Sequence, residues 1–561
     1  MKRILTVLLL MACLVSVVGC ANTDPTPDGM QNVALESAKY NLYVPESWIP
    51  SSYNVSGAKA TAEDNAPNVI VTEHYPESEV TATAYWSEYC MPEHTMVFPA
   101  FTLIEEGTDT TLGGKDAKKY RFSYTFGDTL YQCQQVIAVY DFNVYVLTYT
   151  AVSTAYDTHA SEVDTVISVS LLNNMQQIYL DNSATTGLCR EAKEAMCEAM
   201  ERFGNPSSLH SLGANAARLL REARASVGEA LGERFLKDGQ LIFTSCGTEA
   251  NALALLGTAH AKERRTAHTI LTTDSEHPSV ENNLRLLERE GFSVVRVSTR
   301  GGVLDMDTVR AHCNADLFMV SMMLVNNETG ARYPVEEVFA AAKAANPQCV
   351  CHCDAVQGFL KVPMHIRTMG VDLVTVSAHK IHGPKGVGAL YVSERMLRER
   401  RLSPFLCGGG QEFGLRSGTE NTIGIAGFAA AAKAGAVAAR TAMPHMAHLA
   451  AELVAGLAGS EIRVNRPPVA APHIVNMTLP HIKSETMLHF LSGKGISVSA
   501  GSACSSHAAG PSTVLLAFGL TPAEAASSIR ISFSPENTEE DVKALLAALG
   551  EGVGSLVRIK H

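Results

Sequence analysis

Residues 373–380 read LVTVSAHK, an apolar and β-branched run that ends in a histidine and a lysine. Such a run is typical of a strand buried inside a parallel sheet. Runs of the same kind recur along the chain, at 241–244, 269–273, 293–297, 317–323, 350–353 and 388–392. Amphipathic helices are predicted at 191–203 and 214–231. The alternation over 178–560 predicts an α/β fold, a mainly parallel sheet with helices on its faces.

Polar side chains directly follow five of these strands, at the sheet edge where open α/β sheets bind their ligands. The segments are 243–251 (FTSCGTEAN), 275–277 (SEH), 325–330 (VNNETG), 352–357 (HCDAVQ) and 377–380 (SAHK). Alone, a Gly-Thr-Glu sequence indicates no more than a helix start, and a lone histidine is more often structural. Together the segments suit pyridoxal phosphate, which needs a helix N-terminus for its phosphate, a carboxylate, a stacking partner and a lysine.

A second reactive group lies far downstream, where residues 499–506 read SAGSACSS. Side chains this small have little to pack, so a loop carrying Cys504 is predicted. A lysine that can form a Schiff base and a cysteine on such a loop are the two groups needed to remove sulfur from an amino acid.

From 178 to about 557 the chain resembles the class I cysteine desulfurases, the NifS/IscS group of fold-type I pyridoxal-phosphate enzymes. The matching motifs are 179–186 (YLDNSATT), 203–208 (FGNPSS), the five segments above, 416–419 (RSGT), the Cys504 loop and 528–530 (SIR). The resemblance implies a homodimer. It also implies a large domain with a mainly parallel sheet, followed by a small α/β C-terminal domain.

The resemblance also implies which residues bind pyridoxal 5′-phosphate. Lys380 would hold it covalently, Asp354 would pair with the pyridinium nitrogen, and Gln357 would contact the phenolic oxygen. His277 would stack on the ring and assist proton transfer as a catalytic residue. The phosphate would be bound by Thr248, Ser377 and His379, with Thr419 reaching in from the partner subunit.

The implied reaction converts L-cysteine to L-alanine. Asn327, at the edge of the cofactor site, and Arg530 would hold the substrate carboxylate. Lys380 would remove the Cα proton, and Cys504 would take the sulfur as a persulfide. The acceptor is expected to be an iron–sulfur scaffold or a tRNA-thiolation enzyme. The chain ends at His561 without the longer tail that housekeeping relatives use for scaffold docking, which leaves the acceptor open.

Two other functions fit the same sequence. One is selenocysteine lyase activity, because the same chemistry removes selenium. The other is a surface lipoprotein whose first domain binds a ligand and carries the enzyme as a fused passenger.

The chain opens with the features of an exported lipoprotein. Lys2 and Arg3 are basic, residues 4–18 are apolar but short for a membrane span, and VVGC ends at Cys20. These features predict a signal peptide at 1–20, a lipid anchor on Cys20 as the contact with the membrane, and a tether at 21–34. A plain signal peptide with an incidental cysteine, or a buried helix, is the alternative.

Residues 21–174 contain six lysines and arginines against twenty aspartates and glutamates, a net charge of about −14 against −12 for the whole chain, so the acidity of the chain lies in this part. This acidity argues against nucleic acid or anionic lipid as a direct partner. Strands are predicted at 41–44, 68–72, 81–86, 119–126, 132–140 and 144–150, with a turn at Gly113 and Gly114 and a helix at 156–172. The pattern predicts an antiparallel α+β domain over 35–172, which weakly resembles the PsbP-like domains.

The cysteines outside the loop leave two questions. Cys90 and Cys133 form either a disulfide or two separate buried thiols. Cys349, Cys351 and Cys353 alternate along a predicted strand, a spacing unusual for zinc, so we expect core thiols and no metal site; Cys246 and Cys407 are likewise expected to serve packing.

The predicted domains are 35–172, a large cofactor-binding domain at 175–435 and a small domain at 436–561. Export conflicts with an enzyme whose cofactor and acceptors are cytoplasmic. Three explanations are possible: a real exported fusion, a fusion with a weak signal, or two adjacent genes joined in one sequence. Met175 stands just before the start of the family resemblance, where a start codon would stand. This favours two joined genes and an enzyme that works in the cytoplasm.

Overall fold

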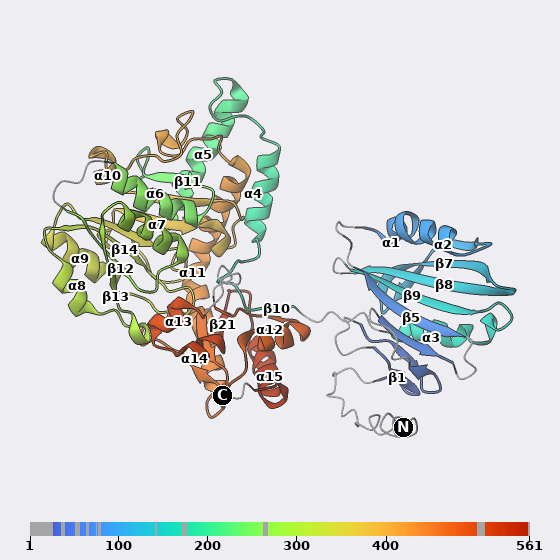
Figure 1. Cartoon of the computed structure of the whole chain (residues 1–561). Coiled ribbons are helices and arrows are strands. Elements are labelled where there is room, and N and C mark those ends of the chain that lie inside the picture. The colour runs from blue at the N-terminus through green and yellow to red at the C-terminus, as the bar shows by residue number, and fades with distance from the viewer. Residues whose placement is uncertain are drawn as a thin grey trace. The chain divides into compact units, whose positions relative to one another are not determined.

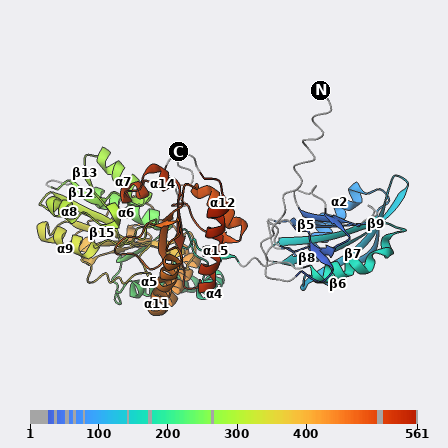
Figure 2. The same cartoon turned by 90° about the horizontal axis from the view of Figure 1, so that it is seen from below.

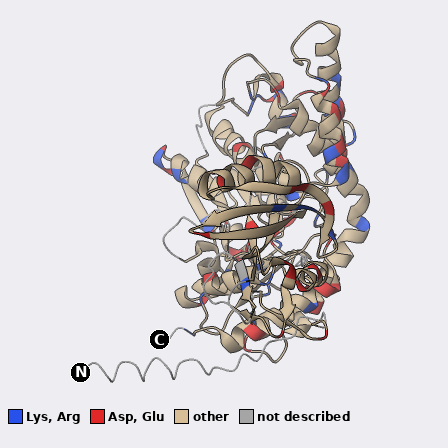
Figure 3. Cartoon of the chain, turned by 90° about the vertical axis from the view of Figure 1, so that its right-hand side faces the viewer, with Lys and Arg blue, Asp and Glu red and all other residues tan. Residues whose placement is uncertain are grey.

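The computed structural model divides the chain into two compact units, Met1–Gln176 and Gln177–His561 (Figure 1). The structure describes residues 26–34, 40–50, 57–62, 67–74, 76, 80–140, 143–170, 177–261, 267–501 and 511–558. Cys20, Met175 and Cys504 lie outside the described residues. Figure 3 shows acidic and basic positions interspersed along the ribbon of the described residues.

The first unit is built on an antiparallel sheet whose central strands lie side by side in Figure 2. The strand order is β3-β4-β5-β9-β8-β7-β6. The bounds are β3 (Ile49–Pro50), β4 (Gly57–Thr61), β5 (Asn68–His74), β6 (Thr102–Leu112), β7 (Lys115–Phe126), β8 (Thr129–Tyr140) and β9 (Asn143–Val152); β1 (Met30–Asn32) pairs separately with β2 (Tyr43–Pro45). Gly113 and Gly114 join β6 to β7 with φ of 57° and 74°, the left-handed conformation that a tight hairpin turn requires.

The prediction of a strand at 81–86 is wrong. This segment forms α1 (Ala82–Tyr85) and enters η1 (Trp86–Cys90) and α2 (Met91–Val97). Thr81 starts the helix because its hydroxyl accepts the Ala84 N–H at 3.1 Å. The buried side chain of Trp86 then stacks on Tyr120, with ring centroids 4.1 Å apart. Apolar burial at helical spacing therefore overrides the alternating sequence pattern.

Helices flank this sheet on two sides. α1 and α2 lie on one side, and α3 (Ala160–Val169), which is shorter than the predicted helix, lies on the other (Figure 1). Cys90 and Cys133 belong to the aromatic cluster under α1 and α2, where both are buried and free. Burial raises the pKa of Cys90 to about 12 and that of Cys133 to about 11. Both thiols therefore stay protonated and unreactive at neutral pH.

The second unit contains a seven-stranded sheet in the order β11-β17-β16-β15-β14-β12-β13. All strands run parallel except β17, which is antiparallel to both of its neighbours. The strands are β11 (Leu241–Thr244), β12 (Thr269–Thr273), β13 (Ser293–Val297), β14 (Leu317–Met323), β15 (Val350–Asp354), β16 (Leu373–Ser377) and β17 (Gly388–Val392). The predicted α/β fold with a mainly parallel sheet is confirmed.

Helices cover this sheet and connect its strands (Figure 1). They are α4 (Arg190–Met200), α5 (Ser211–Ala230), α6 (Gly247–His260), α7 (Pro278–Arg289), α8 (Met306–His312), α9 (Val335–Ala345) and α10 (Glu394–Arg398). The expected domain boundary at 435/436 falls inside α11 (Thr422–Gly456), a helix long and apolar enough to cross a membrane. Its first half packs Phe428 into the core of the large sheet, and its second half packs Leu449 into the core of the small domain.

The small domain is built on β18 (Arg463–Val464), β19 (Ile474–Thr478) and β21 (Ser528–Ser532), with helices α12 (Ser484–Gly493), α13 (Thr513–Phe518), α14 (Pro522–Ala526) and α15 (Glu539–Ser555). β10 (Ile178–Tyr179) pairs in parallel with β20 (Ile496–Ser497), and Leu180 lies in the small-domain core. Residues 178–182, which we expected within the large domain, therefore pack against the small one.

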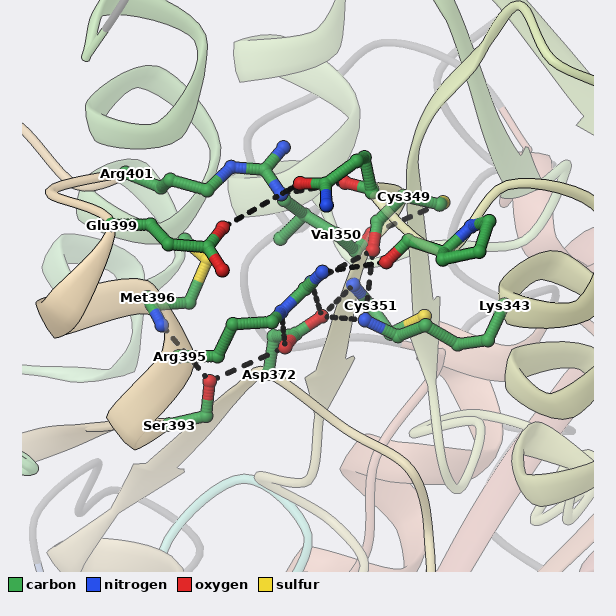
Figure 4. Close-up of polar contacts among 12 residues, drawn as sticks. Lys343, Cys349, Val350, Cys351, Asp372, Ser393, Arg395, Met396, Glu399 and Arg401 are labelled. Atoms are coloured by element: carbon green, nitrogen blue, oxygen red, sulfur yellow. Dashed lines mark hydrogen bonds and ion pairs between the residues drawn. The ribbon is translucent and has the colours of Figure 1, made fainter.

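Asp372 holds together the edge of the sheet where β15 and β16 begin (Figure 4). Its carboxylate accepts hydrogen bonds from Arg395 Nη2 at 2.7 Å, from the Cys351 N–H at 3.0 Å and from Lys343 Nζ. The Asp372 side chain is 5% exposed, whereas those of Arg395 and Lys343 are 21% and 25% exposed. The network joins α9, α10 and two strands at the edge opposite to the carboxyl end of β15.

We expect Asp372→Ala to lower the free energy of unfolding by ~3–5 kcal/mol, because it leaves two partly buried cations without their carboxylate. Urea unfolding followed by circular dichroism measures the change. Asp307→Ala is the control, because Asp307 is 95% exposed in its pair with Arg310, and should cost about 1 kcal/mol or less. An equal loss of unfolding free energy in both variants would contradict the stabilising role assigned to Asp372.

Candidate active site

One pocket at the carboxyl ends of the strands collects nine of the residues predicted to form the site. These are Thr248, His277, Asn327, Asp354, Gln357, Ser377, His379, Lys380 and Arg530. Arg530 comes from β21 of the small domain and the others from the large domain, so the pocket lies where the two domains meet.

Lys380 ends the short helix η4 (Ala378–Lys380) that directly follows β16. Its Nζ donates to the carbonyl oxygens of Ser183 and Ala184, both at 2.7 Å. The same Ser183 carbonyl accepts from Gln357 Nε2 at 2.8 Å. The 179–186 motif therefore acts as a strap that positions both the lysine and the glutamine at the pocket.

His379 is fixed by the other end of that strap. Its carbonyl oxygen accepts from the Thr186 N–H at 3.0 Å, and its Nδ1 lies 3.2 Å from Thr185 Oγ1. Burial, followed by the charge of Lys380, lowers the pKa of His379 to about 4. The imidazole is therefore neutral at pH 7 and can bind a phosphate only as a hydrogen-bond donor.

Asp354, the last residue of β15, is buried and is held by neutral donors. Its Oδ2 accepts from Asn251 Nδ2 at 2.8 Å, and its Oδ1 accepts from the Val356 N–H at 3.0 Å. Within the described ranges no lysine or arginine forms an ion pair with it. A buried carboxylate in this setting gains most from a cationic N–H group, which a pyridinium nitrogen provides.

Asn251 was not assigned a role from the sequence. It lies one turn inside α6, four residues after Gly247, so it faces the same side as the start of that helix. That spacing within the FTSCGTEAN segment is the signal that could have identified it.

His277 caps the start of α7. Its Nδ1 accepts the Ser279 N–H at 3.1 Å, which leaves the proton of the neutral ring on Nε2. Burial, opposed in part by Asp354, lowers the pKa of His277, so the ring is neutral at pH 7. A neutral ring is suited to stacking on another aromatic ring.

The preceding residue, Glu276, is a second buried carboxyl group. Its Oε1 accepts from Thr273 Oγ1 at 2.8 Å and from the Met323 N–H at 2.9 Å. Burial raises the pKa of Glu276 to about 8, so it is mostly protonated at neutral pH and adds little negative charge beside Asp354.

The residues of the pocket fit pyridoxal phosphate. Ser377 Oγ and the Oδ1 atoms of Asn251 and Asn327 are buried without hydrogen-bond partners among the described residues, although all three side chains line the pocket. At the start of α6, a Cβ on Gly247 would lie 3.1 Å from Val356 Cγ2 and 3.5 Å from Ser377 Cβ. A side chain at this position would crowd Val356 and Ser377, so glycine keeps the start of α6 close to the Ser377 hydroxyl. The N–H groups of a first helical turn and a hydroxyl are groups that bind a phosphate.

Arg530 forms a buried wall of the pocket and is 1% exposed. Its Nη1 donates to the Asn327 carbonyl oxygen at 2.8 Å, and its Nη2 donates to Asp181 Oδ1 at 2.7 Å. Its Nε has no partner among the described residues. A guanidinium held in this way can present further N–H groups to a carboxylate.

Other predicted residues lie elsewhere. Thr419 is exposed and is absent from the pocket lining of its own chain, and Cys504 is outside the described residues. Cys246 is half-buried and lines the pocket. The expectation that Cys407 serves packing is wrong, because Cys407 is exposed. Cys349, Cys351 and Cys353 are buried core thiols, as predicted.

Comparison with known proteins agrees with this geometry. Residues 178–545 match the family described as Aminotransferase class-V. A cysteine desulfurase of Trichormus azollae is 37% identical over 387 residues, covering 68% of this chain and 94% of that protein. The cysteine desulfurase NifS of Azotobacter vinelandii is 36% identical over 384 residues, covering 66% and 91%.

Solved structures lead to the same family. A structure described as a NifS-like protein has a TM-score of 0.63 and 35% identity, and the match covers 68% of this chain and 100% of that one. The chain therefore belongs to the class-V aminotransferases, in the cysteine desulfurase group of pyridoxal-phosphate enzymes.

Proposed function

We propose that this chain is an L-cysteine desulfurase in which Lys380 holds pyridoxal phosphate and Cys504 receives the sulfur. The observation that carries the proposal is the meeting of Lys380, Asp354 and Arg530 in one pocket. When bound, the cofactor supplies an electron sink at the Cα atom of the amino acid. Asp354 would hold its pyridinium nitrogen, Gln357 its phenolic oxygen, and Ser377 and the start of α6 its phosphate.

The chain's own groups account for the remaining chemistry. Arg530 and Asn327 bind the substrate carboxylate, and the Lys380 amine, once displaced, takes the Cα proton. The Cys504 thiolate attacks the substrate sulfur, so that an S–S bond forms while the Cβ–S bond breaks. Proton return to the carbon product gives L-alanine, and Cys504 is left as a persulfide for a sulfur-acceptor protein.

Lys380→Ala is expected to abolish both the visible absorbance of the lysine-bound cofactor and the release of alanine from L-cysteine. The Schiff base requires the amine that Ser183 and Ala184 hold in place. Lys385→Ala is the matched control, because Lys385 is an exposed lysine of the same segment, and should retain both signals. A cofactor band that survives in Lys380→Ala would contradict the assignment.

Cys504→Ser is expected to keep the cofactor band and to lose persulfide formation, because a hydroxyl is a poor nucleophile toward sulfur. Persulfide is measured by alkylation and mass spectrometry, alongside alanine release. Cys407→Ser is the control, because Cys407 is an exposed cysteine of the described residues, and it should leave sulfur transfer intact. Sulfur transfer that persists in Cys504→Ser would assign the nucleophile to a different thiol.

We also propose that the enzyme is a homodimer in which Thr419 completes the phosphate site of the partner subunit. Its exposure in its own chain supports this role. Phe203, Leu209 and Phe413 are 81%, 103% and 48% exposed. Large apolar side chains that stay exposed are typical of a protein interface where they gather in one patch.

For the N-terminal region, we propose a lipoprotein signal at 1–20 with lipidation at Cys20, followed by a PsbP-like domain. The antiparallel sheet flanked by helices supports the domain assignment. We further propose that the desulfurase part works in the cytoplasm, where its cofactor and acceptors are found.

An antibody against the second unit tests this location in fractionated native cells. We expect a soluble band that is clearly smaller than the 60.0 kDa full chain, because the enzyme would be made separately from the acidic first unit. A membrane-bound band near the full mass would instead establish an exported, anchored fusion and contradict the cytoplasmic assignment.

A further inference from the structure

We propose that Asp181 is a positioning residue for the substrate carboxylate: it fixes the Arg530 guanidinium so that the free N–H groups of the arginine face the pocket. The inference rests on the proposed function and extends it to a residue outside the predicted site. Asp181 belongs to the YLDNSATT motif and does not itself line the pocket.

Two contacts on different nitrogens determine the orientation of the guanidinium. Asp181 Oδ1 accepts from Nη2 at 2.7 Å, and the Asn327 carbonyl accepts from Nη1 at 2.8 Å. Because the group is planar, these contacts fix both its position and its rotation. Asp181 is the carboxylate that forms an ion pair with Arg530 among the described residues. The buried Nε is left without a partner there and stays available to a ligand.

The backbone around Asp181 is itself held firmly. Asp181 forms a bridge with Ser532 on β21. The next residue, Asn182, donates from Nδ2 to the Ser532 carbonyl at 2.9 Å, and the Ser183 N–H donates to Ser532 Oγ at 2.8 Å. The carboxylate therefore extends from a strap anchored on the same strand as Arg530.

That strap also reaches the lysine, because the Ser183 carbonyl accepts from Lys380 Nζ at 2.7 Å. One short segment thus sets the position of the arginine proposed to bind the substrate carboxylate and of the lysine proposed to hold the cofactor and take the Cα proton. The carboxylate and the Cα proton of an α-amino acid lie on one carbon, so the spacing of these two side chains decides whether the substrate lies in a reactive orientation.

The charge around Arg530 gives Asp181 a second effect. Lys361 is buried nearby, and burial together with the charges of Lys380 and Arg530 lowers the pKa of Lys361 to about 7. His473 is buried with neither ring nitrogen hydrogen-bonded to a described residue. In this basic region the Asp181 carboxylate offsets the cost of burying the Arg530 charge, so it keeps the guanidinium in place before a ligand arrives.

The test compares ligands with and without a carboxylate on the full chain loaded with pyridoxal phosphate. L-alanine and ethylamine share the amine and differ in the carboxylate, and calorimetry gives a Kd for each. We expect Asp181→Ala to weaken the binding of L-alanine by roughly ten- to hundredfold, the range for losing a hydrogen bond to a charged group. The Kd of ethylamine should stay unchanged. The KM for L-cysteine should rise while kcat changes little.

The preference for L-alanine is the Kd of ethylamine divided by the Kd of L-alanine. Asp181→Asn keeps an acceptor oxygen for Nη2 and should lower this preference by less than Asp181→Ala does. It also provides a measurement if the alanine variant does not fold. Asp372→Ala is the control, because Asp372 is a buried carboxylate at the opposite edge of the large sheet and does not line the pocket. Its preference should equal that of the wild type.

An unchanged preference in the Asp181 variants, or an equal weakening of L-alanine and ethylamine, would overturn the inference, since the second result describes a general structural defect. Alanine release from L-cysteine by the wild type tests the proposed function separately. The binding preference depends on the carboxylate contact alone and remains interpretable without that turnover.

Discussion

The site depends on the two hydrogen bonds from Lys380 Nζ to the carbonyl oxygens of Ser183 and Ala184. The lysine is delivered by the end of β16, and the carbonyls belong to a strap that is anchored on the small domain through Ser532. An interaction between these two parts therefore brings the cofactor-binding edge of the large sheet against the strand that carries Arg530. Without it, the lysine proposed to hold the cofactor and the arginine proposed to bind the substrate carboxylate would have no fixed spacing.

The two ends of this pocket carry opposite charge. Asp354 offers a buried carboxylate held by neutral donors, while Lys380, Lys361 and Arg530 surround the side proposed for the substrate carboxylate. The histidines between them are neutral because burial lowers their pKa. A zwitterionic amino acid and a cofactor with an anionic phosphate and a cationic ring nitrogen match this distribution of charge.

Much of the large domain could be predicted, because buried parallel strands read as continuous apolar runs and polar segments directly follow five of these runs. Lys380 and Asp354 were found in this way. The segment 81–86 was mispredicted because its alternating sequence hides a helix that buries Trp86 on the sheet. Asn251 and Asp181 were quoted within motifs but received no role, since their contacts are with residues 103 and 349 positions away.

The sequence by itself determined the chemistry of this protein, because a lysine, a carboxylate, an arginine and a loop cysteine in a recognisable order specify which cofactor and reaction are available. Tertiary structure alone decided how those groups are held. Packing brings Asp181 of the strap and Arg530 of β21 to 2.7 Å, and places Thr419 on the surface rather than in its own pocket. Contacts of this kind depend on how separate elements pack, which no local pattern of residues encodes.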